Sequence, residues 1–374
     1  MKTETLIIGA GPSGLAVAGQ LRQAGLRFEI VEQADKVASK WHQHYDRLRL
    51  HTVKSLSSLP YEDFPNHYPK YVPKKQLIAY YESYAHKFKI YPHFNTSVTS
   101  ITKDSEGWQF QCTHSKVFIA NHVIIYKGLN RIPNIPTWNG QYVFTCDILH
   151  ASAYKNPSAY QDKKVLVVGM GNTGADIALD LAEAGFDVSI SVRSNPIIVP
   201  RDFMGSPVQI TAKKLAKLPF GLGDFIGKMV RKIVFGNLDK YGLRMPAISP
   251  MTLRLKHGKT PTIDIGTVQK IKEGKIRLLK DIEEFKATSI LFTDGHTENF
   301  DTLILATGYE AQIDSFLGNA SQILNQHGEP KVKIGDGTAQ GLYFMGYEKF
   351  TFGGILGTLK QDAALIVNDI KGMG

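Results

Sequence analysis

Residues 6–14 decide the fold, and they read Leu-Ile-Ile-Gly-Ala-Gly-Pro-Ser-Gly. The three apolar residues before the first glycine are typical of a short buried parallel strand. Residues 15–21 after the turn have the composition of a helix, and a second predicted strand, 27–31, ends at Glu32. Strand, G-x-G-x-x-G turn, helix, strand and acid in this order predict a dinucleotide-binding βαβ unit.

Each part of this first turn has a physical task. The first glycine makes the tight turn, the second lets the backbone approach a pyrophosphate, and the third lets helix and strand pack closely. The N-terminus of the helix supplies free N–H groups for the phosphates. Glu32 can accept hydrogen bonds from ribose hydroxyls and would repel a 2′-phosphate, which favours FAD or NAD(H) over NADP(H). The predicted cofactor-binding residues are Gly9, Gly11, Pro12, Ser13, Gly14 and Glu32.

A second turn of the same kind follows Lys164 and the apolar residues 165–168. It reads Gly-Met-Gly-Asn-Thr-Gly over 169–174 and leads into a predicted helix over 175–184 and a strand over 187–192. Arg193 then stands where the first unit has its acid, and a guanidinium pairs bidentately with a phosphate. This favours NADPH, with a solvated surface arginine as the alternative interpretation. The predicted binding residues are Gly169, Gly171, Asn172, Thr173, Gly174, Arg193 and Ser194.

Two turns of opposite ribose preference indicate that electrons arrive on NADPH and leave through a bound flavin. We predict an α/β chain of two Rossmann-like, three-layer domains. The FAD domain is expected to be discontinuous, over 1–154 and 302–374, with the NADPH domain inserted at 155–301. A helical insertion is expected near 205–250.

Composition narrows the class of protein further. The chain has 374 residues, 43% of them hydrophobic, and no apolar run of the roughly 20 residues that span a bilayer. Two distant cysteines and the absence of a signal peptide before the first strand indicate a cytoplasmic protein. The net charge of +10 is spread along the chain without a nucleic-acid-binding motif, and the 12 histidines lack a metal-binding spacing. The basic and apolar stretch 213–240 is interpreted as a helical insertion, with a membrane-surface helix as the alternative.

Several further segments resemble the flavin-containing monooxygenases, the class B flavoprotein monooxygenases. The resemblance runs from residue 6 to about residue 370 and is strongest to the plant indole-3-pyruvate monooxygenases, the YUCCA group, and their bacterial relatives. The segments that carry it are Tyr-Asp-Arg-Leu-Arg-Leu-His at 45–51, Leu-Pro at 59–60, Asp-Phe-Pro at 63–65, Tyr-Pro at 68–69, Tyr71, Val-Pro-Arg at 199–201, Gly-Lys-Thr-Pro at 258–261, Ile-Asp at 263–264 and Ala-Thr-Gly-Tyr at 306–309. Phe144, His150 and Tyr154 also match the family's identifying motif.

The resemblance implies an FAD- and NADPH-dependent monooxygenase. In the family, reduced flavin and oxygen form a C4a-(hydro)peroxide that oxygenates a small organic substrate. N- or S-oxygenation and oxidative decarboxylation of an aryl 2-oxo acid both fit. The resemblance also implies His51 as the catalytic residue near the flavin, and it adds as cofactor-binding residues Lys40, Trp41, Gly128, Thr307, Gly308 and Tyr309, with Arg201 as a weaker candidate.

The sequence departs from the family at two places. Cys146 replaces the glycine of the identifying motif, and Tyr126-Lys127 replaces Ala-Thr at the end of a strand that reaches the cofactors. These departures keep one alternative open, an NADPH oxidase or flavin reductase that releases hydrogen peroxide. A flavin-binding redox sensor without turnover is a further alternative, against which the intact second glycine turn and Arg193 speak. The expected partners are molecular oxygen and a small organic substrate, with a homodimer as one option for assembly.

Overall fold

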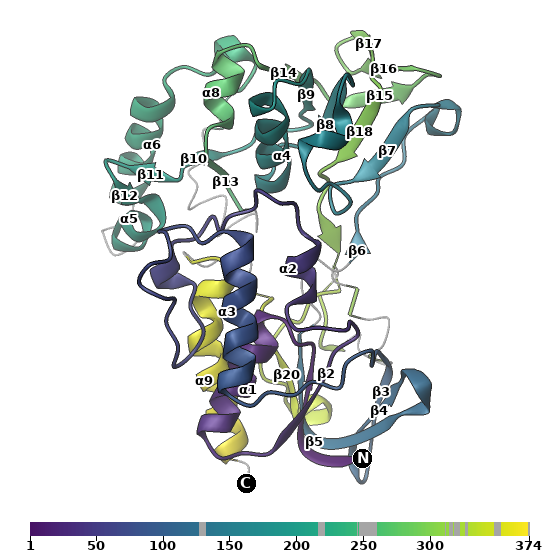
Figure 1. Cartoon of the computed structure of the whole chain (residues 1–374), viewed down its shortest axis with the longest axis vertical. Helices are drawn as coiled ribbons and strands as arrows, with labels where there is room; N and C mark the ends of the chain where they lie inside the picture. Colours follow the sequence, from purple (N-terminus) through teal and green to yellow (C-terminus); the bar gives the residue numbers. More distant parts are fainter. Residues whose placement is uncertain are drawn as a thin grey trace. The chain divides into compact units, whose positions relative to one another are not determined.

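The structure is a computed structural model of the whole chain (Figure 1). It describes residues 1–126, 132–215, 221–244, 246, 260–310, 312, 313, 317, 322–325, 328–347 and 353–372. The chain divides into two compact units. Unit 1 comprises Met1–Gln43, Thr52–Ile132 and Tyr309–Gly374, and unit 2 comprises His44–His51 and Pro133–Gly308.

Unit 1 is built on a six-stranded mixed sheet. Its strands are β1 (Lys2–Ile8), β2 (Phe28–Val31), β3 (Val98–Asp104), β4 (Gly107–Cys112), β5 (Val117–Ile125) and β20 (Leu342–Phe344). Both β2 and β5 pair with β1 in parallel. On the side away from β1, strand β5 has two partners. Its first half pairs with antiparallel β4, and its last three residues pair with parallel β20.

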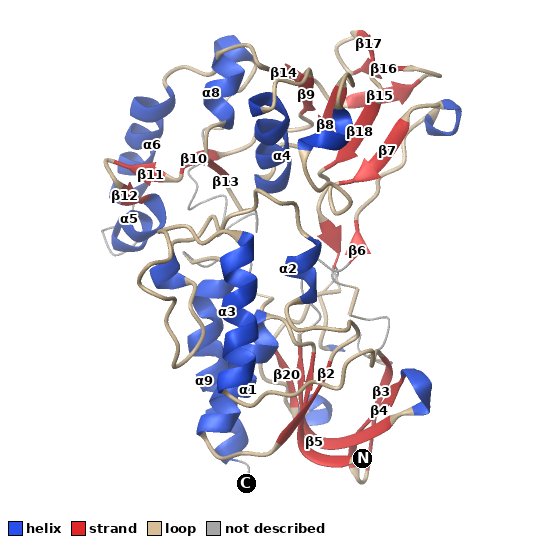
Figure 2. Ribbon diagram, in the orientation of Figure 1, coloured by secondary structure: helices blue, strands red, loops and turns tan. Residues whose placement is uncertain are grey.

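Helices pack beside this sheet in unit 1. The helices are α1 (Pro12–Gln23), α2 (Ser39–Gln43), α3 (Lys74–Lys87) and α9 (Leu359–Gly372). Helix α1 contacts α3 and α9 (Figure 2). Along β1 the side chains alternate between the two faces, so Leu6 and Ile8 enter the cluster that contains Trp108 and Phe110 of β4.

Unit 2 is built on a five-stranded parallel sheet in the order β14-β9-β8-β18-β7. These strands are β7 (Asp147–His150), β8 (Val165–Val168), β9 (Val188–Ser191), β14 (Ile276–Leu279) and β18 (Thr302–Leu305). Side chains along β8 again point alternately to the two faces of the sheet, so each face has its own hydrophobic core. Val165 and Val167 pack with α4 (Asn172–Glu183), and Leu166 and Val168 pack with the antiparallel sheet of β15 (Ile282–Phe285), β16 (Ser289–Phe292) and β17 (Thr297–Asn299). Unit 2 therefore has three layers.

The remaining elements of unit 2 are short. They are the strands β10 (Ile198–Pro200), β11 (Asp202–Phe203), β12 (Ser206–Pro207) and β13 (Thr262–Asp264), and the helices α5 (Val208–Leu215), α6 (Leu222–Phe235) and α8 (Thr267–Lys272). Helices α5 and α6 form the described part of the expected insertion near 205–250. Two further strands, β6 (Ile132–Pro133) and β19 (Tyr309–Glu310), lie where the chain passes between the units.

The predicted fold class is confirmed, since two Rossmann-like α/β units are present. The predicted boundaries between the two domains, at residues 154 and 302, differ from the boundaries between the two units in the structure. There the main segment of unit 2 begins at Pro133 and ends at Gly308. The reason is that β7 and β18 pair inside the sheet of unit 2. The expected helix after Gly353 begins as a 3-10 turn, Ile355–Thr358, and the α-helix starts at Leu359.

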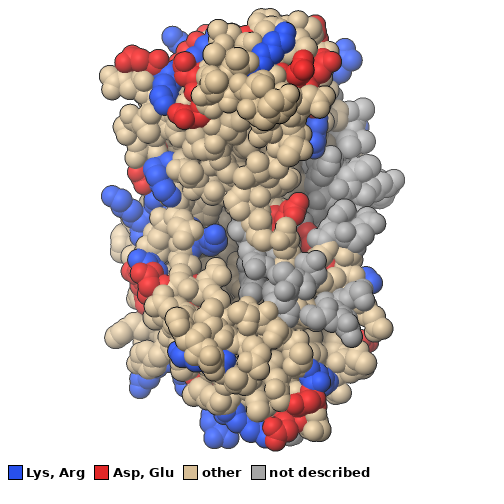
Figure 3. Space-filling view, turned by 90° about the vertical axis from the view of Figure 1, so that its right-hand side faces the viewer, with Lys and Arg blue, Asp and Glu red and all other residues tan. Residues whose placement is uncertain are grey.

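Helix length and surface charge complete the description of the fold. No helix among the described residues is both long and apolar enough to cross a membrane. On the face shown in Figure 3, basic and acidic side chains are interspersed over the described surface.

Candidate functional site

The first glycine turn joins β1 to α1 within unit 1. Gly9 has φ +103°, a value that favours glycine. A Cβ on Gly14 would overlap the carbonyl oxygen of Gly9. The third glycine therefore allows α1 to start directly against the strand end, as the sequence predicts.

The α1 N-terminus and Glu32 are arranged as a dinucleotide site requires. Gly11 is the N-cap of α1 and provides no capping side chain, so the first N–H groups of the helix are left for a ligand. Glu32 is 6% exposed and accepts hydrogen bonds from the N–H groups of Ala10 (2.8 Å) and Ala34 (3.0 Å). These bonds orient the carboxylate, and its remaining lone pairs can accept from ribose hydroxyls.

The side chain of Tyr126 lies where an FAD site needs open space. Tyr126 directly follows β5, and its ring lies over Gly11, since a Cβ built on Gly11 would stand 2.9 Å from Tyr126 Cε1. The backbone and Glu32 therefore fit FAD, while the space in front of the second glycine is taken by a side chain. Lys127 and Gly128, which follow, lie outside the described residues.

The second turn repeats the first one almost exactly in its backbone. Gly169 also has φ +103°, and Gly171 has the same N-cap angles as Gly11, φ −78° and ψ −177°. A Cβ on Gly174 would overlap the Gly169 carbonyl oxygen. In front of Gly171, however, an added Cβ would meet no atom within 4 Å. The second turn is thus open where the first is covered.

A cavity of about 660 Å³ lies at this second turn, within the size range of small-ligand and cofactor sites. Five of the residues predicted from the sequence line it, namely Gly169, Gly171, Arg193, Ser194 and Thr307, together with Ala306. Arg193 is exposed and has no ion pair among the residues that the structure describes. The cavity therefore fits NADPH, with an arginine available for a 2′-phosphate.

Other predicted residues of this region have structural contacts as well. Asn172 Oδ1 accepts the backbone N–H of Ile263 at 2.7 Å, which ties the start of α4 to β13. Thr307 Oγ1 donates to the carbonyl of Asn134. His150 Nε2 lies 3.0 Å from the carbonyl oxygen of Gly308. Thr173 is half-buried in the first turn of α4. Cofactor contacts of these residues stay predictions.

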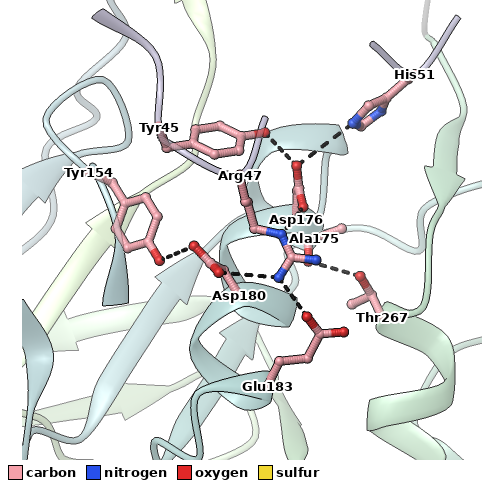
Figure 4. Close-up of polar contacts among 9 residues, drawn as sticks. All are labelled: Tyr45, Arg47, His51, Tyr154, Ala175, Asp176, Asp180, Glu183 and Thr267. Atoms are coloured by element: carbon pink, nitrogen blue, oxygen red, sulfur yellow. Dashed lines mark hydrogen bonds and ion pairs between the residues drawn. The ribbon is translucent and has the colours of Figure 1, made fainter. Parts of the chain in front are cut away.

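His51 lies in unit 2, in a polar cluster on the face of α4 (Figure 4). Its Nε2 is 3.9 Å from Asp176 Oδ2, and Tyr45 donates a hydrogen bond of 2.8 Å to the same oxygen. Asp176 is only 2% exposed. The segment His44–His51 is therefore anchored to the helix that starts at the second glycine turn.

Arg47 carries the positive charge of this cluster. Its Nε is 3.2 Å from Asp176, and its Nη1 is 3.2 Å from Asp180 and 2.9 Å from Glu183. The Arg47 pKa is raised, because its partial burial, which would lower it, is outweighed by the three carboxylates. Tyr154, predicted from the family motif, donates to Asp180 at 2.8 Å. Burial raises the Asp180 pKa although Tyr154 and Arg47 stabilise the charged form.

The sequence had assigned no role to Asp176, Asp180 or Glu183. Their spacing could have indicated a role, because residues four and three positions apart lie on one face of a helix. Three carboxylates on one face favour a cation packed against them. Arg47 was quoted only as part of a family segment, and no local pattern links residues 47 and 176. This pairing is a product of tertiary structure.

Three further predicted residues, Lys40, Trp41 and Tyr309, lie in unit 1. Lys40 is exposed and Trp41 is half-buried in the short helix α2, with the Trp41 ring 6.2 Å from that of Tyr81. Tyr309 is half-buried at the start of β19. Within the described part of the chain, no group of histidine, cysteine and acidic side chains suits a metal ion. The two free cysteines are Cys112, which is buried, and Cys146, which is half-buried.

Comparison with known proteins decides the family. The sequence profile of the flavin-binding monooxygenase-like proteins (FMO-like) matches residues 2–328. The chain belongs to the flavin-binding monooxygenase-like family. The resemblance seen in the sequence is thereby confirmed.

Individual relatives cover almost the whole chain. The indole-3-pyruvate monooxygenase YUCCA1 of Oryza sativa subsp. japonica is 37% identical over 371 residues, which are 98% of this chain and 90% of that protein. The probable indole-3-pyruvate monooxygenase YUCCA9 of Arabidopsis thaliana is 38% identical over 98% of this chain and 88% of its own length.

Solved structures agree on the fold. A flavin-containing monooxygenase from Stenotrophomonas maltophilia superposes with a TM-score of 0.74 at 17% identity, over 98% of this chain and 99% of its own. An oxidized steroid monooxygenase bound to NADP superposes with a TM-score of 0.74 at 18% identity, over all of this chain and 86% of its own.

The family membership makes this chain a flavin-containing monooxygenase that uses FAD and NADPH. Its reaction partners are molecular oxygen and an organic substrate. The two alternatives, a peroxide-releasing oxidase and a redox sensor without turnover, are not favoured by these relatives.

Two glycines of the second turn provide a matched pair of substitutions. We expect Gly171→Ala to fold with a free energy of unfolding within about 1 kcal/mol of wild type, because its added Cβ meets open space. The same methyl should raise the NADPH dissociation constant about tenfold or more by standing where the pyrophosphate approaches. Gly174→Ala should instead lose about 1–3 kcal/mol of stability through overpacking. Denaturant titration and NADPH fluorescence titration measure the two effects, and equal behaviour of both variants would contradict this assignment.

Arg193 is expected to distinguish the two nicotinamide cofactors. Arg193→Ala should raise the NADPH dissociation constant about 10- to 100-fold through loss of a charge-assisted hydrogen bond. NADH lacks the 2′-phosphate, so its binding should change by less than about twofold and serves as the control. Equal loss for both cofactors, measured by fluorescence titration, would show that Arg193 does not read the phosphate.

Arg47 is expected to be essential for the stability of unit 2. Arg47→Ala leaves the buried Asp176 without its cation, which should cost about 3–5 kcal/mol in the free energy of unfolding. Glu183→Gln is the control, because Glu183 is 49% exposed and its loss should cost at most about 1 kcal/mol. Chemical denaturation followed by circular dichroism measures both, and similar losses in the two variants would show that burial of Asp176 does not govern the cluster.

Proposed function

We propose that this monooxygenase acts on an aryl 2-oxo acid and decarboxylates it oxidatively. The observation that carries the proposal is the identity of 37–38% with indole-3-pyruvate monooxygenases over 98% of the chain. The surplus of 44 Lys and Arg over 34 Asp and Glu also favours an anionic substrate.

The reaction balances with the cofactors of the family. A 2-oxo acid, O2, NADPH and a proton give the acid that is one carbon shorter, CO2, water and NADP+. NADPH supplies two electrons, and cleavage of the bond between the carboxyl and keto carbons supplies the other two that reduce O2 fully. When bound, FAD supplies the electron transfer and the activation of oxygen.

The residues of this chain have distinct tasks in the proposal. Glu32 and the N-terminus of α1 bind FAD, while Arg193, Ser194 and the open backbone at Gly171 hold NADPH. His51 is the residue that we propose for a hydrogen bond to the reacting oxygen. Tyr45 and Arg47 hold its segment on α4. A cytoplasmic location and a homodimer stay predictions of the sequence.

The proposal is tested by a substrate panel scored for coupling. We expect an aryl 2-oxo acid to raise the rate of NADPH consumption and to lower the amount of hydrogen peroxide released per NADPH consumed. A substrate labelled at its carboxyl carbon should yield labelled CO2. The matched control is the corresponding 2-hydroxy acid, which keeps the carboxylate and the ring but lacks the keto group. A tertiary amine and a thioether represent N- and S-oxygenation.

Two outcomes would overturn the proposal. If the amine or the thioether is oxygenated and the 2-oxo acid releases no labelled CO2, the enzyme is an N- or S-oxygenase instead. Stoichiometric hydrogen peroxide with every compound would restore the oxidase alternative.

A further inference from the structure

The two glycine turns of this chain provide an internal comparison. Strand β5 lies beside β1 in parallel, as β18 lies beside β8. The residue that follows each of these neighbouring strands is Tyr126 in unit 1 and Ala306 in unit 2. In each unit its carbonyl faces the first glycine of the turn, Gly9 or Gly169. Tyr126 and Ala306 therefore occupy equivalent places.

The side chains at these equivalent places have opposite consequences. An added Cβ on Gly11 would stand 2.9 Å from Tyr126 Cε1 and 3.5 Å from Tyr126 Cδ1. On Gly171, which has the same backbone angles, an added Cβ would meet nothing within 4 Å. The second glycine of such a turn is where the backbone approaches a pyrophosphate. In unit 1 that approach is filled by an aromatic ring.

The ring is held from a second side. An added Cβ on Gly346 would stand 2.5 Å from Tyr126 Cε2 and 2.7 Å from Ser13 Oγ. The ring thus lies between Gly11 and Gly346, next to the first turn of α1. Burial raises the pKa of Tyr126, an effect that Ser13 opposes, so the phenol is neutral at physiological pH.

Ser13 shows that this place is built for a polar ligand. Ser13 is completely buried, and apart from an interaction with Tyr126 that lowers the pKa of the phenol, its Oγ has no hydrogen-bond partner among the described residues. Once the ring has turned away, this buried hydroxyl would lack a partner, and a phosphate oxygen at the α1 N-terminus would satisfy it. The polar groups around the ring therefore suit an anion better than they suit the ring.

We propose that Tyr126 closes the first dinucleotide site and that FAD binds only to molecules in which the ring has turned away from Gly11. Tyr126 then sets the affinity of the chain for FAD. The inference rests on FAD being the ligand of the first turn, and it does not depend on the substrate. If the ring is turned away in about one molecule in ten, the apparent dissociation constant is about tenfold higher than that of an open site.

The experiment titrates the full-length apoprotein with FAD and follows the change in flavin fluorescence. Tyr126→Ala reproduces the side chain of Ala306 and should lower the FAD dissociation constant about tenfold. Tyr126→Phe keeps the ring without its hydroxyl and should stay within about twofold of wild type. Circular dichroism establishes that each apoprotein is folded before the titration.

A reciprocal substitution tests the same geometry in unit 2. Ala306→Tyr should raise the NADP+ dissociation constant about tenfold and leave the FAD dissociation constant unchanged. It keeps the inference testable if Tyr126→Ala does not fold, because the ring is then added to an open site instead of being removed from a closed one.

The inference is overturned if folded Tyr126→Ala binds FAD no more tightly than wild type, because the ring would then support the cofactor. If that variant does not fold, unchanged NADP+ binding by Ala306→Tyr overturns it. Both titrations are made without turnover. Failure of the substrate panel with these affinities as expected would therefore contradict the proposed reaction alone.

Discussion

The structure depends on a close approach between a helix start and a strand end, and the chain makes it twice. At Gly14 and at Gly174 there is no room for even one methyl group, because it would overlap the carbonyl oxygen of the first glycine of the turn. This contact places the α1 and α4 N-termini over the carboxyl ends of β1 and β8. The free N–H groups and the partial positive charge of each helix then face the place where a phosphate binds.

Helix α4 serves two purposes through this placement. Its N-terminus borders the cavity with Gly171, while the acidic face one turn further holds Arg47 and the segment that ends at His51. The buried carboxylate of Asp176 is stable only because Arg47 and Tyr45 compensate it. The position of His51 is thereby tied to the helix that starts at the second glycine turn, which gives a physical reason for the 45–51 segment to occur together with that turn.

Much of the structure around the two glycine turns was predictable from local sequence patterns. Periodicity identified β1, α1, β8 and α4, and the residue after each second strand, Glu32 or Arg193, indicated the ribose preference of its site. The limits of the units were less predictable, because strand pairing between β7 and β18 joins residues more than 150 positions apart. The partners of Arg47 were not predictable either, since ion pairs across 130 positions leave no local signal.

The sequence by itself determined that there are two dinucleotide turns, that Glu32 at the first favours FAD or NAD(H) while Arg193 at the second favours NADPH, and that the chain resembles the monooxygenases. The turns and their ribose preferences follow from short-range geometry, which a few consecutive residues specify, whereas the resemblance rests on many short segments along the chain. Only the tertiary structure decided that Gly171 opens onto a cavity while Gly11 is covered by Tyr126, and that His51 rests on Asp176. Such properties depend on which side chain a neighbouring strand brings to the turn, and that is set by the pairing of distant segments.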